Sequence, residues 1–217
     1  MKYKYIFFDL DGTLLNTLED LKDSTNYALA QHSYPTRTLE EVRCFVGNGI
    51  RKLIDRAVPE GTSVEKTDKV FATFREYYAT HSRVKTSMYE GMEQVMDALK
   101  EQNISMAIVS NKADDAVKDL AKYYFAKYID VAIGEREGIS RKPAPDSVYE
   151  AMRLLGATKE NTVYVGDSDV DRATAKNAGI PCISVTWGFR SEELLVSLEP
   201  EYLIHKPEEI LSVVTGK

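Results

Sequence analysis

Short apolar runs recur along the chain, and longer amphipathic stretches separate them. Such runs, when glycine or polar residues bound them, are typical of buried strands in a parallel sheet. They cover residues 5–8, 105–109, 131–133, 162–165 and 182–185, with a further candidate at 202–204. Helical spacing of apolar residues appears between them at 92–99, 113–125, 146–155 and 171–178. This alternation predicts an α/β fold in which helices cover both faces of a parallel sheet.

The stretch from about residue 15 to residue 83 differs from the rest, because it shows helical periodicity almost throughout and no convincing strand. Helices are predicted at 18–31, 39–45, 50–57 and 64–81. We therefore expect a core formed by residues 1–14 and 85–217, and an all-helical cap formed by residues 15–84. Open parallel sheets bind ligands at the carboxyl ends of their strands, so an insert after the first strand could close over a site.

Composition excludes several classes of function. A chain of 217 residues with 43% hydrophobic content can bury a core without disulfides or structural metals, and its two cysteines are far apart. The net charge of −6 argues against nucleic acid or an anionic membrane as a partner. The apolar run near the N-terminus ends at Asp9, and no other run is long enough to span a bilayer. We expect a cytoplasmic protein.

Polar residues suited to phosphate chemistry follow the predicted strands. The first strand ends in Asp9-Leu10-Asp11-Gly12-Thr13, and the second in Ser110-Asn111-Lys112. A loop after the third carries Arg141-Lys142-Pro143-Ala144-Pro145, and the fourth strand runs into Gly166-Asp167-Ser168-Asp169-Val170-Asp171. Because parallel strands end at the same edge of a sheet, these segments are expected to meet.

The residue types themselves indicate a phosphoryl-transfer site. Asp9 is the candidate nucleophile, since a carboxylate that attacks phosphorus divides one difficult hydrolysis into two easier steps. Asp11 points to the same side of an extended chain and can protonate a leaving alkoxide, then deprotonate water. Carboxylates facing a phosphate dianion need a cation, for which Mg²⁺ is suitable, and Asp167 is a further candidate ligand. Ser110 can donate a hydrogen bond to phosphoryl oxygens, and Lys142 can supply positive charge.

These four motifs resemble those of the haloacid dehalogenase superfamily in their residues and in their order along the chain. The resemblance extends over essentially the whole sequence. The overall pattern, including Val185-Thr186-Trp187-Gly188-Phe189, is similar to phosphoglycolate phosphatases of that superfamily. The resemblance implies a Rossmann-like α/β core with an inserted helical cap. It also implies that Mg²⁺ is held by the carboxylates of Asp9 and Asp167 and the backbone carbonyl of Asp11. The residues it implies for phosphate binding are Ser110, Asn111 and Lys142.

Two assignments stay open at the level of sequence. Asp171 could bind the metal directly, act through water or hold Lys142. Gly47-Asn48-Gly49 lacks the preceding strand and following Gly-Lys-Ser/Thr of a phosphate-binding loop, so a turn between helices is the simpler interpretation. The resemblance nevertheless makes this segment a candidate for substrate specificity, with Arg51 or Lys52 meeting a substrate carboxylate.

We therefore expect a Mg²⁺-dependent phosphomonoester hydrolase that acts on a small phosphorylated metabolite, as a monomer or a homodimer. The family resemblance makes phosphoglycolate the first substrate to try. The alternatives are a phosphosugar mutase resembling β-phosphoglucomutase, a pyrophosphatase or nucleotidase of the same family, and a non-catalytic phosphate-binding module. Asp11 argues against the last, because a binding module needs no proton donor. It also argues against dehalogenation, since a departing halide needs no proton.

Overall fold

The computed structural model describes residues 2–216 and divides the chain into two compact units. One unit is formed by Met1–Leu15 and Met88–Lys217, and the other by Asn16–Ser87. The predicted action of the inserted segment as a cap stays a prediction.

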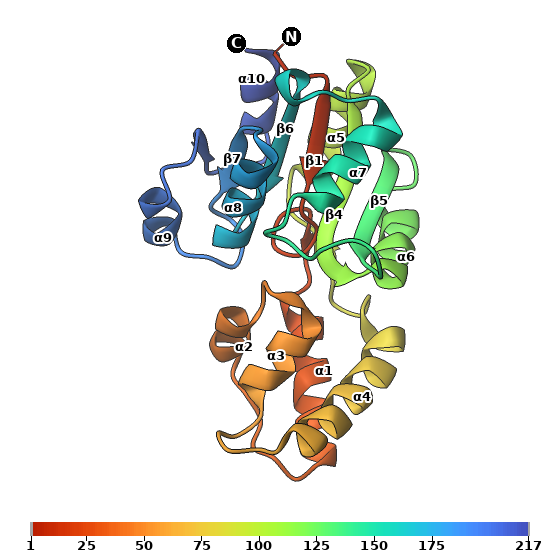
Figure 1. The fold of residues 1–217 in the computed structure, drawn as a ribbon, viewed down its shortest axis with the longest axis vertical. Coiled ribbons are helices and arrows are strands. Elements are labelled where there is room, and N and C mark those ends of the chain that lie inside the picture. The colour runs from red at the N-terminus through yellow and green to blue at the C-terminus, as the bar shows by residue number, and fades with distance from the viewer. Residues whose placement is uncertain (1, 217) are drawn as a thin grey trace. The chain divides into compact units, whose positions relative to one another are not determined.

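The first unit contains a six-stranded sheet in the order β5-β4-β1-β6-β7-β8, and all neighbouring pairs are parallel (Figure 1). The strands are β1 (Tyr5–Phe8), β4 (Ser105–Ala113), β5 (Ile129–Glu135), β6 (Thr162–Gly166), β7 (Cys182–Val185) and β8 (Tyr202–Ile204). The predicted parallel α/β fold is confirmed. The strand β4 continues to Ala113, which is four residues beyond the predicted end at 109.

Helices cover both faces of this sheet, as Figure 1 shows. They are α5 (Met92–Glu101), α6 (Asp114–Tyr124), α7 (Asp146–Leu155), α8 (Asp169–Ala178), α9 (Glu192–Ser197) and α10 (Glu209–Thr215), with a 3₁₀ turn at Lys159–Asn161. Successive strand residues point to opposite faces. Ile6 and Phe8 accordingly belong to the apolar cluster that includes α5 and α10, whereas Phe7 belongs to the cluster with α7 and α8. The central strand β1 is thus buried on both sides, and the chain leaves it at Asp9.

The second unit consists of four helices, α1 (Leu18–Gln31), α2 (Leu39–Phe45), α3 (Gly49–Ala57) and α4 (Val64–His81). Capping residues determine two of their starts. Thr38 forms a capping box with Glu41, and the Ser63 hydroxyl accepts the N–H of Lys66. The unit has its own core, in which Ile54, Val70 and Phe74 are buried completely. The sequence therefore encodes this unit as a separate helical bundle.

Two short strands that the sequence did not predict mark where the chain enters and leaves this unit. They are β2 (Leu15–Asn16) and β3 (Ser87–Met88), which pair with each other. Within the helical unit, the carboxylate of Asp20 accepts hydrogen bonds of 2.8–3.0 Å from the backbone N–H groups of Lys85 and Thr86 and from the Thr86 hydroxyl. Asp20 is only 2% exposed. Its buried charge therefore ties the segment leaving the unit to the first turn of α1.

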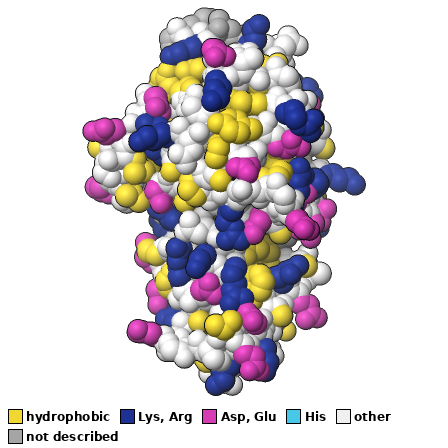
Figure 2. All heavy atoms as spheres, in the orientation of Figure 1, with side chains coloured by type: hydrophobic (Ala, Val, Ile, Leu, Met, Phe, Trp, Pro, Cys, Tyr) yellow, Lys and Arg dark blue, Asp and Glu magenta, His cyan; other side chains and the backbone are white. Residues whose placement is uncertain are grey.

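The distribution of charged side chains and the character of the helices match what the composition predicts. Figure 2 shows basic and acidic side chains interspersed over the face in view. Across residues 2–216, no helix combines the length and the apolar character needed to cross a bilayer.

Candidate active site

Three aspartates meet at the carboxyl ends of the central strands. Asp9 follows β1, and its N–H donates to the carbonyl of Val165 on β6 at 2.9 Å. Asp167 follows β6, and Asp171 lies in the first turn of α8. These three side chains are buried, and each has a carboxylate oxygen within 4.8 Å of one from each of the others. The topology thus brings together residues that are far apart in sequence.

The crowding of carboxylates makes this a site for positive charge. Burial and the charge of Asp171 raise the pKa of Asp9 from its usual 3.8 to about 7. Burial and the charges of Asp171 and Asp9 raise the pKa of Asp167 to about 8. The buried Oδ1 of Asp9 accepts no hydrogen bond from the described residues, although it faces the Lys142 ammonium at 2.9 Å. Oxygen donors with excess negative charge fit a hard divalent cation such as Mg²⁺.

Lys142 supplies a buried positive charge to the same cluster. Its Nζ lies 2.7 Å from Asp171 Oδ1 and 2.9 Å from Asp9 Oδ1, and it donates to the Tyr164 hydroxyl at 3.0 Å. Burial alone would lower the pKa of Lys142, but the charges of Asp171 and Asp9 raise it well above its usual value. The ammonium group therefore stays charged beside the candidate nucleophile, where the sequence predicted a phosphate-binding lysine.

The side chain of Asn111 holds the backbone of Lys142. Its carbonyl oxygen accepts the Lys142 N–H at 2.8 Å, and its amide donates to the Lys142 carbonyl at 3.1 Å. The Lys142-Pro143 peptide bond is cis. Asn111 was expected to bind phosphate, and that stays a prediction. Its observed hydrogen bonds instead position the backbone of Lys142.

Of the open roles for Asp171, the contacts favour holding Lys142. Besides its pairing with that lysine, the Oδ1 atom lies 3.3 Å from the Tyr164 hydroxyl. The Oδ2 atom accepts the hydroxyl of Ser168 at 2.6 Å and its N–H at 3.2 Å. A Cβ on Gly166 would lie 2.3 Å from the Cβ of Asp171, so only glycine fits there. The sequence did not predict a role for Tyr164 in the site, because a tyrosine within a buried strand such as β6 is typical of core packing.

Asp167 is clamped by two loops. Its Oδ1 accepts the Thr13 hydroxyl at 3.2 Å, and its Oδ2 accepts the Phe189 N–H at 2.7 Å. A Cβ on Gly12 would lie 2.5 Å from Asp167 Oδ2, and one on Gly188 would lie 2.2 Å from Asp167 Cβ. Both glycines therefore permit the close approach of backbone to this carboxylate. Thr13 and Phe189 belong to the sequence motifs, but no sequence pattern pairs either residue with Asp167.

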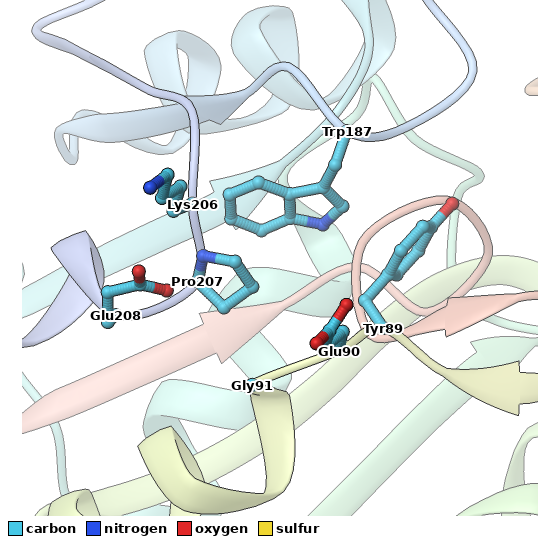
Figure 3. Close-up of a pocket in the computed structure, with 7 residues that line it drawn as sticks. All are labelled: Tyr89, Glu90, Gly91, Trp187, Lys206, Pro207 and Glu208. Atoms are coloured by element: carbon cyan, nitrogen blue, oxygen red, sulfur yellow. The ribbon is translucent and has the colours of Figure 1, made fainter.

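Trp187 connects this clamp to a neighbouring pocket of the same unit. The indole Nε1 donates to the carbonyl of Thr13 at 3.1 Å, and the Tyr89 ring centroid is 6.4 Å from that of Trp187. In Figure 3 the indole lies between Tyr89 and the Lys206–Glu208 segment. The pocket has a volume of about 550 Å³ and is lined by Tyr89, Glu90, Gly91, Trp187, Lys206, Pro207 and Glu208. Trp187 thus supports the loop that carries Thr13.

Asp11 and the second motif form another part of the site. The Asp11 carboxylate pairs with Lys112 Nζ at 3.0 and 3.1 Å. Ser110 is 5% exposed, and its Oγ accepts the N–H of Lys112 at 3.3 Å. Asp11 and Ser110 are the residues of this part that the sequence predicted in the site, whereas Lys112 had no predicted role.

The predicted specificity residues lie in the helical unit. Gly47 and Gly49 have φ values of +120° and +80°, which fits a turn, and α3 begins at Gly49. Asn48 accepts a hydrogen bond from Arg56 at 2.8 Å. Arg51 pairs with Asp55 at 2.8 Å and also with Asp68. Recognition of substrate by this segment stays a prediction, and the Arg51 guanidinium already has two carboxylate partners within its own unit.

Known proteins resemble this chain over most of its length. Residues 6–185 match the family model described as haloacid dehalogenase-like hydrolase. Pyrophosphatase PpaX of Halalkalibacterium halodurans is 30% identical, with 100% of this chain and 99% of the relative covered. Phosphoglycolate phosphatase 1 of Pseudomonas aeruginosa is 31% identical, with 96% of this chain and 78% of the relative covered.

A solved structure shows the same architecture. It is that of a Lactobacillus delbrueckii subsp. bulgaricus protein assigned as a phosphoglycolate phosphatase, with 33% identity, a TM-score of 0.94 and full coverage of both chains. Together these matches confirm the predicted resemblance and the predicted enzyme class, a phosphatase.

Proposed function

The chain belongs to the haloacid dehalogenase-like hydrolases, and we propose that it is a Mg²⁺-dependent phosphomonoesterase that forms an aspartyl-phosphate on Asp9. One observation carries the proposal. Asp9, Asp167 and Asp171 lie within 4.8 Å of one another, with the Lys142 ammonium 2.9 Å from Asp9. A nucleophile, oxygen ligands and a buried positive charge are what phosphoryl transfer through a carboxylate needs.

The carboxylates of Asp9 and Asp167, with the backbone carbonyl of Asp11, would hold the metal ion. When bound, Mg²⁺ supplies the positive charge that lets a carboxylate and a phosphate dianion approach each other. Thr13 and the Phe189 N–H orient Asp167 for this task. Asp171 remains the partner of Lys142.

The chain's own residues then carry out two displacements. A carboxylate oxygen of Asp9 forms a bond to phosphorus as the ester oxygen leaves with a proton from Asp11. Asp11 next accepts a proton from water, whose oxygen attacks the same phosphorus and restores the Asp9 carboxylate. Throughout, the Lys142 ammonium offsets negative charge on the phosphoryl oxygens.

Phosphoglycolate is the first substrate to test, because relatives at about 30% identity are named phosphoglycolate phosphatases. Pyrophosphate is the second candidate, because other relatives at 30–31% identity are named pyrophosphatase PpaX. The phosphoryl-transfer residues serve any phosphate ester, so they do not select between these substrates.

The test is Mg²⁺-dependent phosphate release from phosphoglycolate, pyrophosphate, sugar phosphates and nucleotides. We expect turnover of at least one of them, and none by Asp9→Asn, a nearly isosteric variant whose thermal unfolding shows whether it is folded. Appreciable turnover by folded Asp9→Asn contradicts the covalent route. Conversion of a sugar 1-phosphate into its 6-phosphate without free phosphate indicates a mutase instead.

A further inference from the structure

The ion pair between Lys112 and Asp11 has no part in the scheme above. Lys112 Nζ lies 3.0 Å from one oxygen of the Asp11 carboxylate and 3.1 Å from the other. The Lys112 side chain is only 2% exposed and that of Asp11 16% exposed. A lysine this deeply buried is almost always paired with a charge. Contact with both oxygens holds the carboxylate in one orientation.

The backbone of β4 is shaped to bring Lys112 to this position. The parallel register of β4 with β5 shifts between Val109 and Ala113, so the intervening residues leave the regular ladder. Gly134 on β5 provides the space, since a Cβ there would lie 2.6 Å from the Lys112 carbonyl oxygen. Irregularities of this kind redirect side chains near active sites. The ammonium of Lys112 consequently meets Asp11 beyond the end of β1.

We propose that Lys112 is the positioning residue for proton transfer by Asp11. The inference rests on the proposed function, in which Asp11 gives a proton to the leaving oxygen and takes one from water. Such transfer needs the carboxyl oxygen within hydrogen-bond reach of the reacting atom, and a displacement of about 1 Å can cost about 100-fold in rate. Lys112 reduces the number of orientations open to Asp11 before the substrate binds.

The two buried lysines of the site have different partners. Lys142 contacts Asp9 and Asp171, whereas Lys112 contacts Asp11. This division assigns Lys142 to the nucleophile and Lys112 to the proton-transfer group. The rival role for Lys112 is direct contact with the substrate phosphate, which would affect all phosphate esters alike.

The test compares Lys112→Met, Asp11→Asn and the double variant, with Mg²⁺ present, on an alkyl phosphate and on p-nitrophenyl phosphate. An alkoxide needs a proton to leave, but p-nitrophenolate does not. We expect Lys112→Met to lower kcat/KM for the alkyl ester by about 100-fold or more and for the aryl ester by less than about 10-fold. In the Asp11→Asn background the same change should cost less than about 3-fold, because Lys112 acts through Asp11.

Lys118→Met is the matched control, since Lys118 is half-exposed and pairs with Asp114 on the surface of α6. It should leave both rates unchanged. Lys112→Arg retains a cation and should recover part of the alkyl rate. Thermal unfolding identifies any variant that fails to fold, and if Lys112→Met does, the alkyl-to-aryl ratio of Lys112→Arg carries the test.

Equal losses on both esters overturn the proposal. A loss in the Asp11→Asn background as large as in the wild type also overturns it, in favour of direct phosphate binding. A wild-type protein that releases phosphate from no ester instead overturns the proposed function, and the role of Lys112 with it.

Discussion

Asp20→Asn should destabilise the helical unit strongly, although the side chain changes by only one atom. The carboxylate accepts three donors, the N–H of Lys85, the N–H of Thr86 and the Thr86 hydroxyl, at 2.8–3.0 Å. The Lys85 N–H lies 3.0 Å from both carboxylate oxygens, so an asparagine whose oxygen serves Thr86 turns its NH₂ group toward this N–H. At least one hydrogen bond to a charged acceptor, about 1.5–3 kcal/mol, is then lost, and a buried donor left unpaired costs about 1–3 kcal/mol more.

The expected loss in the free energy of unfolding is therefore about 2.5–6 kcal/mol. At about 2–4 °C per kcal/mol for a chain of this size, the melting temperature should fall by about 10 °C. Urea unfolding followed by circular dichroism measures the free energy. Asp23→Asn is the control, because Asp23 also pairs with Lys85 but is 39% exposed, and its change should stay below about 1 kcal/mol. A loss for Asp20→Asn no larger than that of the control would refute the reasoning.

Three further predictions concern the acidic cluster. The emission of Trp187, the chain's one tryptophan, should change on Mg²⁺ addition, because its indole holds the Thr13 carbonyl, and Asp167→Asn should abolish the response. Gly188→Ala should raise the Mg²⁺ concentration for half-maximal activity by about 10–100-fold, and an unchanged activation curve would contradict the clamp on Asp167. With Mg²⁺ chelated, the folded protein retains protons on Asp9 and Asp167 up to pH about 7 and about 8, whereas the unfolded chain loses them near 3.8. Its melting temperature should therefore fall as pH rises from about 4 to 8, and a melting temperature that rises over this range would exclude these shifts.

The short, locally patterned elements were predictable from the sequence. β1 and β7 begin and end where their apolar runs do, and α1 and α4 match their predicted bounds. A buried run or an amphipathic repeat carries its own signal. The segments α9 and α10 were not predicted, because helices of six or seven residues give only a weak periodic signal; among helices this short, that signal was sufficient for the seven-residue α2.

The extension of β4 to Ala113 shows why features that depend on distant segments cannot be predicted from local sequence patterns. It depends on a register shift against β5 and on the space beside Gly134, which no local pattern reveals. The strands β2 and β3 depend in the same way on segments more than 70 residues apart.

For the site, the sequence by itself determined which chemical groups stand at the strand ends, because the topology of a parallel sheet brings those ends to one edge. Asp9, Asp11 and Asp167 could be assigned in this way. Only the tertiary structure decided which group pairs with which: Asn111 with the Lys142 backbone, Asp171 with the Lys142 ammonium and Lys112 with Asp11. The physical reason is that a buried charged group pairs with an oppositely charged group close to it in space. In this site the two partners are 29–101 residues apart along the chain, so no local sequence pattern reveals the pair.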